Sequence, residues 1–278
     1  MRWCVSIAVI LAAGAIAGGD VSGVAAPNAQ ALLAVDEAKR VDVELVLAVD
    51  VSYSMDMEEL ALQREGYAEA LVSTEFLQAL KTGPTGKIAI TYFEWAASSD
   101  QKIIIPWRVI DGPESADAVS AEILKAPLRR ASRTSISGAI NFAMPLFEAN
   151  EYRGLRRVID ISGDGPNNNG EPVTIVRDAA LAKGVTINGL PIMAKEVNYS
   201  TMDIEKLDIY YEDCVIGGAG SFVVAIKGKE KFKEAIRTKL VLEVANRMPE
   251  PRVVPAAPLP PRTDCLIGEK IWQDRWGR

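Results

Sequence analysis

Three short segments of the sequence carry oxygen-bearing side chains in patterns that could hold a cation. The first is DVSYS, in which Asp50 is followed by hydroxyls at alternate positions, Ser52 and Ser54. The second is RTSISGAI, which contains Thr134, and the third is SGDG, which contains Asp164. Two carboxylates and three hydroxyls, with no nitrogen or sulfur donor, form a ligand set typical of Mg²⁺ or Mn²⁺. Calcium would prefer more direct carboxylates.

The composition narrows the chemistry that this chain can perform. Its 278 residues are 49% hydrophobic and 24% charged, which is enough to bury a large core. The chain has no histidine, which excludes Ser-His-Asp and Cys-His hydrolases and histidine-liganded metal sites. Any metal must therefore be held by oxygen. A net charge of −6 and the lack of a basic stripe argue against a nucleic-acid partner.

The first residues follow the order of a secretory signal. Arg2 precedes an apolar run over residues 4–17, and small residues follow it. The run is too short to cross a bilayer comfortably. We expect residues 1–31 to be a signal peptide cleaved after Ala17 or Ala31, with a buried helix or an uncleaved anchor as alternatives. The mature protein would then be periplasmic or secreted, with no stable membrane span.

Export would leave two cysteines, Cys214 and Cys265, in the mature chain. An even number of cysteines in an oxidising compartment indicates a disulfide between them, and two separate thiols are the alternative. The disulfide would tie the C-terminal tail to the domain.

From residue 41 onward, apolar runs alternate with amphipathic stretches. This pattern predicts a three-layer, doubly wound α/β domain over residues 41–247, with a mostly parallel six-stranded sheet of order 3-2-1-4-5-6. The third strand should lie at an edge because it contains Pro106. The expected strands span residues 43–49, 87–93, 102–107, 157–161, 186–190 and 222–226.

Helical periodicity fills the segments between these strands. Gly184 is expected to end the fourth helix, and residues 248–262, with six prolines, should form a semi-rigid linker before the tail at 263–278. The expected helices span residues 58–80, 115–125, 136–147, 173–182, 202–210 and 229–245.

This topology would bring the three polar segments together. In the order 3-2-1-4-5-6 the first and fourth strands are neighbours, and a crevice opens where their connections leave in opposite directions. Asp50, Ser52 and Ser54 follow the first strand, and Asp164 follows the fourth. Thr134 lies just before a helix whose first turn has unpaired backbone donors.

The combination of DVSYS, the later Thr134 and the later Asp164 resembles the metal-ion-dependent adhesion site of von Willebrand factor type A (vWA) domains. The resemblance covers about residues 41–245. It implies that Ser52 and Ser54 bind the metal directly, that Thr134 joins them when ligand is bound, and that Asp50 and Asp164 act largely through water. With mostly neutral ligands the cation keeps much of its charge, so an acidic group of a partner protein can complete its coordination.

Other segments resemble a narrower family. YFEWA, DCVIGGAGSFVV and KLVLEVA are similar to a bacterial family of exported proteins with a single vWA domain and no assigned function. That resemblance implies no activity.

Each site residue also has a purely structural interpretation. Ser52 and Ser54 could cap the helix expected over 58–80, and Thr134 or Ser135 could cap the helix expected over 136–147. Asp164 could simply belong to a turn. Residues 167–169, three asparagines, could form a polar rim of the site or a solvated turn. Trp272 and Trp276 in the tail are four apart, so one helical face could present both, either to the domain or to a partner.

We therefore expect a non-enzymatic, exported binding protein that grips an Asp or Glu of a protein partner through Mg²⁺ or Mn²⁺. An assembly module whose metal only stiffens loops is one alternative, and a metal-dependent hydrolase is another. An aspartyl-phosphate phosphotransferase would need a carboxylate where Ser52 stands, and the GxxxxGK[ST] motif of P-loop proteins is absent.

Overall fold

The computed structural model describes residues 37, 39–194, 202–245 and 263–277. The expected signal peptide (1–31) and proline-rich linker (248–262) lie outside these residues. Within the described part of the chain, no helix is both long and apolar enough to cross a membrane.

The sheet has five strands in the order β3-β2-β1-β4-β5. All neighbouring pairs are parallel except β2 with β3, which is antiparallel and places β3 at the edge. The predicted order is thus confirmed for these five strands, including the edge position of the strand that contains Pro106. The strands are β1 (Arg40–Asp50), β2 (Ile88–Trp95), β3 (Gln101–Ile110), β4 (Arg153–Gly163) and β5 (Val185–Pro191).

The predicted sixth strand, residues 222–226, does not form. The segment lies beside β5 but pairs with it and the residue after it only through isolated bridges, Gly189 with Val223 and Ile192 with Ile226. The ladder is interrupted between these bridges because Pro191, at the end of β5, has no backbone N–H to donate. At the start of the segment the Phe222 N–H donates to the side-chain oxygen of Asn188 at 2.9 Å. The prediction of six strands was therefore wrong, although the segment lies where a sixth strand would be.

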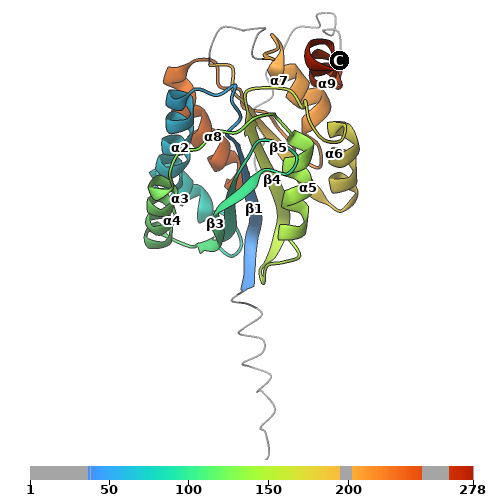
Figure 1. Cartoon of the computed structure of the whole chain (residues 1–278). Helices are drawn as coiled ribbons and strands as arrows, with labels where there is room; N and C mark the ends of the chain where they lie inside the picture. Colours follow the sequence, from blue (N-terminus) through green and yellow to red (C-terminus); the bar gives the residue numbers. More distant parts are fainter. Residues whose placement is uncertain (1–36, 38, 195–201, 246–262, 278) are drawn as a thin grey trace, which may run out of the picture. The chain divides into compact units, whose positions relative to one another are not determined.

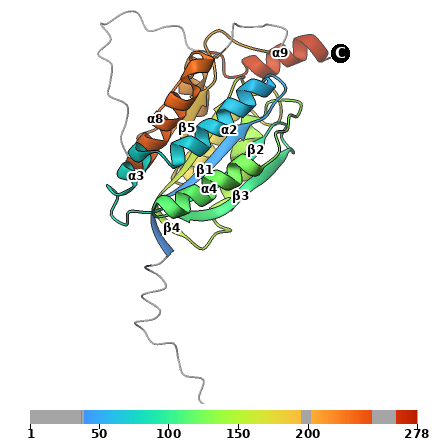
Figure 2. The ribbon, with the colours of Figure 1, turned by 90° about the vertical axis from the view of Figure 1, so that its left-hand side faces the viewer.

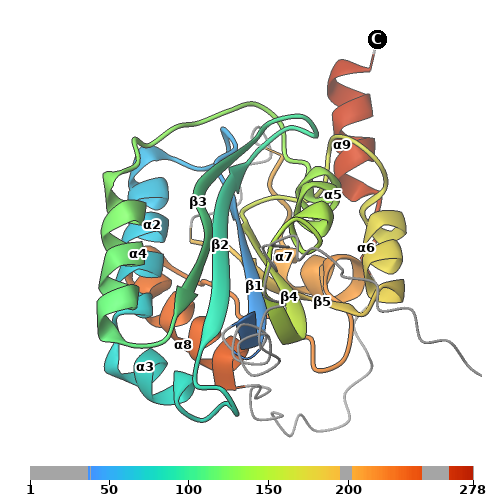
Figure 3. The same cartoon turned by 90° about the horizontal axis from the view of Figure 1, so that it is seen from below.

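Helices cover both faces of the sheet (Figures 1 and 3). Helices α2, α3, α4 and α8 cover one face, and they are seen in front of the sheet in Figure 2. Helices α5, α6 and α7 cover the other face. The bounds are α2 (Met57–Leu71), α3 (Thr74–Leu80), α4 (Pro113–Lys125), α5 (Ile136–Leu146), α6 (Val173–Ala182), α7 (Leu207–Tyr210), α8 (Phe232–Ala245) and α9 (Ile267–Trp276).

Two helix predictions were wrong in detail. The single helix expected over 58–80 is broken after Val72, because Ser73 caps α3 by accepting from the N–H of Phe76 at 3.2 Å. The helix expected over 202–210 begins only at Leu207, and it continues as one π-helical turn, Tyr211–Val215. Gly184 ends α6 with a φ of +77°, as expected for a C-terminal glycine.

Strand β1 is buried on both faces. Val43, Leu45, Leu47 and Val49 belong to the hydrophobic core that includes residues of α2, α4 and α8. The alternate residues Val46 and Ala48 belong to the core that includes residues of α5 and α6. Because both faces of the strand are packed, the carboxyl ends of β1 and β4 are held firmly, and the loops that leave them carry the polar residues.

Candidate metal centre

Asp50 is the last residue of β1 and is completely buried. One of its oxygens, Oδ1, accepts a hydrogen bond of 2.7 Å from the backbone N–H of Ser52. Its other oxygen, Oδ2, is buried and has no hydrogen-bond partner within the described residues. The short turn that follows β1 is therefore organised around a carboxylate with an unused acceptor.

Asp164 follows β4 and is joined to the same turn. Its Oδ1 accepts a 2.5 Å hydrogen bond from Ser54 Oγ, and Ser54 Oγ lies 2.7 Å from Ser52 Oγ. Gly163 allows this close approach, because a Cβ at that position would lie 2.8 Å from Asp50 Oδ2. The structure thus connects both carboxylates and both serines in one network.

Thr134 lies on a loop that is tied to the end of β1. The backbone bridge between Ser52 and Ala131 holds the start of this loop, with the Ala131 N–H donating to Val51 O at 2.9 Å. Thr134 is 4% exposed, and its hydroxyl lies 3.8 Å from the position that a Cβ on Gly165 would take. All five predicted residues therefore belong to the crevice between β1 and β4.

The three asparagines after Asp164 hold the Thr134 loop in place. Asn168 accepts from the Thr134 N–H at 3.0 Å and donates its own N–H to Thr134 O at 2.8 Å. Asn167 accepts from the Ser137 N–H, and Asn169 O accepts from Ser135 Oγ. Because Asn167 is fully buried and Asn168 is 8% exposed, this segment is not a solvated turn. Asn168 lines the pocket beside Thr134, as the polar-rim interpretation expected. Composition alone could not distinguish these bracing contacts from a polar loop.

The two adjoining helices are capped by other residues. Asp56 caps α2 and forms a reciprocal capping box with Glu59, so Ser52 and Ser54 are not needed as caps. Ser135 caps α5 through the N–H of Gly138 at 3.1 Å. The capping interpretation was therefore wrong for Ser52, Ser54 and Thr134, which line a pocket instead, and it is confirmed for Ser135.

The electrostatics of the crevice favour a bound cation. Burial, together with the neighbouring negative charge of Asp164, raises the pKa of Asp50 well above its ordinary value, although hydrogen bonds from Ser52 partly offset this. Within the described residues no Lys or Arg forms an ion pair with Asp50. A buried carboxylate with an unused oxygen, beside a second carboxylate and three hydroxyls, fits a divalent cation with oxygen ligands.

Two tyrosines that sequence reasoning missed lie beneath the site. A Cβ at Gly163 would be 2.9 Å from the Tyr211 hydroxyl, so Tyr211 reaches the same backbone point as Asp50 Oδ2. Burial, and then the charge of Asp50, raises the pKa of Tyr211 well above its ordinary value, so it stays neutral. The Tyr210 hydroxyl accepts from the Asn167 N–H at 3.1 Å. Both tyrosines therefore support the site from within the core.

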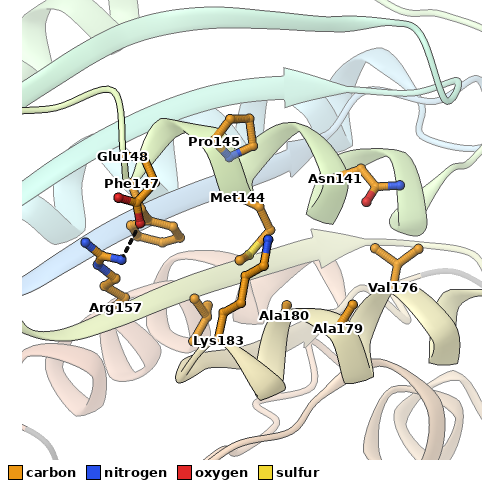
Figure 4. A pocket seen from close by; sticks show the side chains of 11 residues that line it. Asn141, Met144, Pro145, Phe147, Glu148, Arg157, Val176, Ala179, Ala180 and Lys183 are labelled. Atoms are coloured by element: carbon orange, nitrogen blue, oxygen red, sulfur yellow. Dashed lines mark hydrogen bonds and ion pairs between the residues drawn. The ribbon is translucent and has the colours of Figure 1, made fainter.

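A pocket of about 310 Å³ opens over this network, and the hydroxyl residues Ser52, Ser54 and Thr134 line it. A second pocket, of about 580 Å³, lies between α5 and α6 (Figure 4). Its lining includes Met144, Val176 and Lys183, and its one drawn ion pair, Arg157 with Glu148, involves a carboxylate that is 76% exposed. It contains no cluster of buried acids, so the smaller pocket is the better candidate for a functional site.

The C-terminal helix α9 is attached to the domain near this site. Cys214 and Cys265 form a disulfide, with their Cα atoms 5.4 Å apart. Asn167 Nδ2 donates to Glu269 Oε1 at 2.7 Å, and Trp272 and Trp276 line the 310 Å³ pocket. Figure 1 shows α9 at the end of the domain where β1 and β4 terminate. The tail thus contributes to the surroundings of the candidate site.

The sheet order and the helical layers define a vWA-like domain, and comparisons with known proteins agree. The chain belongs to the family described as "Protein of unknown function (DUF1194)", whose model matches residues 40–248. No curated protein matches the sequence significantly.

Solved structures with this fold include several vWA proteins. Proximal thread matrix protein 1 from the mussel byssus is 14% identical with a TM-score of 0.53, and the match covers 74% of this chain and 48% of that one. A second structure of the same protein has a zinc-occupied MIDAS motif, where MIDAS stands for metal-ion-dependent adhesion site. This structure is 16% identical with a TM-score of 0.51, over 74% of this chain and 48% of that one.

Two bacterial structures are similar to the same extent. A von Willebrand factor type A protein from Catenulispora acidiphila is 12% identical with a TM-score of 0.52, over 74% of this chain and 43% of that one. The pilus adhesin SpaC from Lactobacillus rhamnosus GG is 12% identical with a TM-score of 0.53, over 74% and 30%. The matched region is thus less than half of each of these chains, and at this identity the likeness establishes the fold alone.

Proposed function

We propose that this domain binds an acidic group of a partner protein through a divalent cation, Mg²⁺ or Mn²⁺, held in the crevice between β1 and β4. The observation that carries the proposal is the network of Asp50, Ser52, Ser54 and Asp164, in which one buried oxygen of Asp50 accepts no hydrogen bond from the residues that the structure describes. Thr134 adds a third hydroxyl to the same crevice. A relative whose MIDAS motif holds zinc supports the use of a metal.

The residues present suit capture of a carboxylate. Ser52, Ser54 and Thr134 would offer neutral oxygens, while Asp50 and Asp164 supply negative charge beneath them. A cation bound here would provide a positive charge that the neutral ligands do not cancel, and a position for one oxygen of a partner's Asp or Glu. Adhesins and matrix proteins among the relatives are consistent with protein binding.

The proposed role is binding without catalysis. A hydrolase would need a positioned base with a suitable pKa, and Asp50 lies under the serines with one oxygen already bonded to the Ser52 N–H. Hydrolysis of a phosphate or glycosyl substrate that depends on Asp50 would contradict this. We also place the protein in the periplasm or outside the cell, which the Cys214–Cys265 disulfide supports because disulfides persist in oxidising compartments.

The metal can be tested directly by calorimetric titration with Mg²⁺ and with Mn²⁺. We expect saturable binding to the wild type and its loss in the double variant Ser52→Ala/Ser54→Ala. Ser99→Ala is the matched control, because Ser99 is exposed and lies on another loop. Binding that is unchanged in the double variant would contradict the proposed site.

Partner capture tests the second half of the proposal. The immobilised wild type should retain proteins from an envelope fraction in Mg²⁺ and release them in EDTA, and the double serine variant should retain none of these. Capture that survives both EDTA and the double variant would favour the alternative, an assembly module whose metal only stiffens loops.

A further inference from the structure

One side of the pocket above the metal centre is aromatic and comes from the C-terminal helix. Trp272 and Trp276 line the pocket together with Met202 and Tyr53. The two indole centroids lie 4.2 Å apart with 33° between the ring planes, so they form one tilted stack. Trp276 is 50% exposed and Tyr53 is 59% exposed. Accessible aromatic surface therefore borders the three hydroxyls.

Helix α9 is fixed to the domain at several points. The disulfide joins Cys265, just before α9, to Cys214 in the π-helical turn. Glu269 accepts from the Asn167 side chain at 2.7 Å, and Gly268 packs so closely that a Cβ there would lie 2.0 Å from Asn167 O. Asn167 also accepts a hydrogen bond from the Ser137 N–H in the first turn of α5, just after the Thr134 loop. The aromatic surface is therefore anchored to the same part of the chain as the candidate metal centre.

Two arginines flank this aromatic surface. The guanidinium of Arg133 lies 3.2 Å from the centroid of the Trp272 ring, and that of Arg130 lies 5.3 Å from the Tyr53 ring. Arg133 adopts a φ of +76°, an unfavourable conformation for a residue other than glycine. This strained residue sits directly before Thr134. Positive charge beside a carboxylate-binding centre favours an acidic partner segment.

We propose that α9 is a specificity element, so that the domain selects acidic peptide segments in which the captured Asp or Glu is next to an aromatic residue. This rests on the proposed function. The carboxylate would enter toward Ser52 and Ser54, and the neighbouring ring would pack on Trp272 and Trp276. A volume of about 310 Å³ suits one or two side chains. This is the lower end of the range for ligand pockets, about 300–1,000 Å³.

The test uses three fluorescein-labelled peptides, GGWDGG, GGSDGG and GGWNGG, and the full-length oxidised protein in Mg²⁺. Fluorescence anisotropy should show that GGWDGG binds about five- to tenfold more tightly than GGSDGG, the gain of one aromatic contact. GGWNGG should bind much more weakly than both, because it lacks the carboxylate.

The variant Trp272→Ala/Trp276→Ala should bind GGWDGG and GGSDGG equally while keeping its preference for Asp over Asn. Gln273→Ala, on an exposed position of the same helix, should behave as the wild type. Cys265→Ser, which removes the anchor of α9, should weaken the tryptophan preference but not the preference for Asp.

The outcomes separate the two proposals. Equal binding of GGWDGG and GGSDGG by the wild type, with GGWNGG weaker, would overturn the specificity role of α9 and leave metal-mediated capture standing. Failure of the protein to distinguish Asp from Asn in Mg²⁺ would overturn the proposed function itself. A tryptophan preference that persists in the double tryptophan variant would also overturn the role of α9.

Discussion

The domain contains two clusters of buried carboxylates that are balanced in different ways. In the first, Asp50 is fully buried at the end of β1, and within the described residues it has no ion pair. In the second, Asp160 of β4 and Glu243 of α8 both lie 2.7 Å from Nζ of Lys239, which is also fully buried. The second cluster thus carries its own cation, and the carboxylate of the first lacks one.

The contrast indicates what each cluster is for. Lys239 links β4 to α8, and Glu243 also accepts from Asn188 of β5 at 2.8 Å, so this cluster fixes α8 to the sheet. Burial alone would lower the pKa of Lys239, but Asp160 and Glu243 raise it, so the lysine stays charged. The link between α8 and the sheet therefore contains its own positive charge, Lys239. The loop at the end of β1 has no such lysine beside Asp50 among the described residues, which suits the external cation that we propose.

The largest expected effect comes from removing the internal cation. Lys239→Met leaves Asp160 and Glu243 buried without a neighbouring positive charge, and we expect the free energy of unfolding at pH 8 to fall by about 3–5 kcal/mol. Urea denaturation followed by circular dichroism measures this. Lys233→Met, on the same helix but exposed, should change little. Equal stability of the two variants would mean that the buried cluster contributes nothing to the link between α8 and the sheet.

Stability at the proposed metal centre should depend on an added cation, whereas the other cluster depends on the internal Lys239. At a Mg²⁺ concentration of 100 times Kd, the wild type should gain about 2.7 kcal/mol of stability. Ser52→Ala/Ser54→Ala should gain none. Lys239→Met should keep most of the gain despite its lower starting stability. Parallel urea titrations with Mg²⁺ and with EDTA provide the measurement. A gain that disappears in Lys239→Met would show that the two clusters are one coupled unit.

Asp50→Asn makes the contrast sharper. Without metal, Asp50 is buried next to the negative charge of Asp164, so a neutral side chain of the same shape should stabilise the protein by about 1–2 kcal/mol in EDTA. The same change should remove the Mg²⁺-dependent gain. If Asp50→Asn is less stable than the wild type in EDTA, the buried carboxylate of Asp50 does not destabilise the folded state. Its Oδ2 would then accept a hydrogen bond in solution.

Much of the arrangement of the candidate site could be predicted because its parts lie at strand ends. Buried parallel strands are continuous apolar runs in the sequence, so the polar residues after Val49 and Gly163 stand out. The switch of direction between the first and fourth strands then places Asp50 and Asp164 together. Local pattern and topology agree there, and the sheet order follows from the same runs.

The buried lysine cluster could not be predicted in this way. Lys239 and Glu243 are four apart on a helix, which usually indicates a solvated ion pair, and Asp160 is far away in the sequence. The one available signal was a carboxylate in the middle of the apolar strand RRVIDIS, since such a group needs a partner when buried. The hydrogen bond from the Phe222 N–H to the Asn188 side chain, at the start of the segment predicted as a sixth strand, likewise depends on a tertiary contact.

The smallest expected effect concerns pH and tests how the lysine cluster is charged. Burial, together with the nearby Glu243, raises the pKa of Asp160 to about 7, although Lys239 partly offsets this. An unfolded Asp has a pKa of about 3.9, so between these values the folded state binds more protons than the unfolded state. Stability should therefore fall as the pH rises from 4 toward 7.

Asp160→Asn removes that dependence, so its stability should decline less steeply over the same interval. The difference between the two proteins cancels the share of Asp50, which has the same sign, and it should amount to about 1 kcal/mol per pH unit near pH 5 to 6. Urea titrations in EDTA at three pH values measure it. Parallel curves would mean that Lys239 keeps Asp160 ionised throughout, and the cluster would then be a fully formed ion pair, even more unlike the metal centre than its geometry suggests.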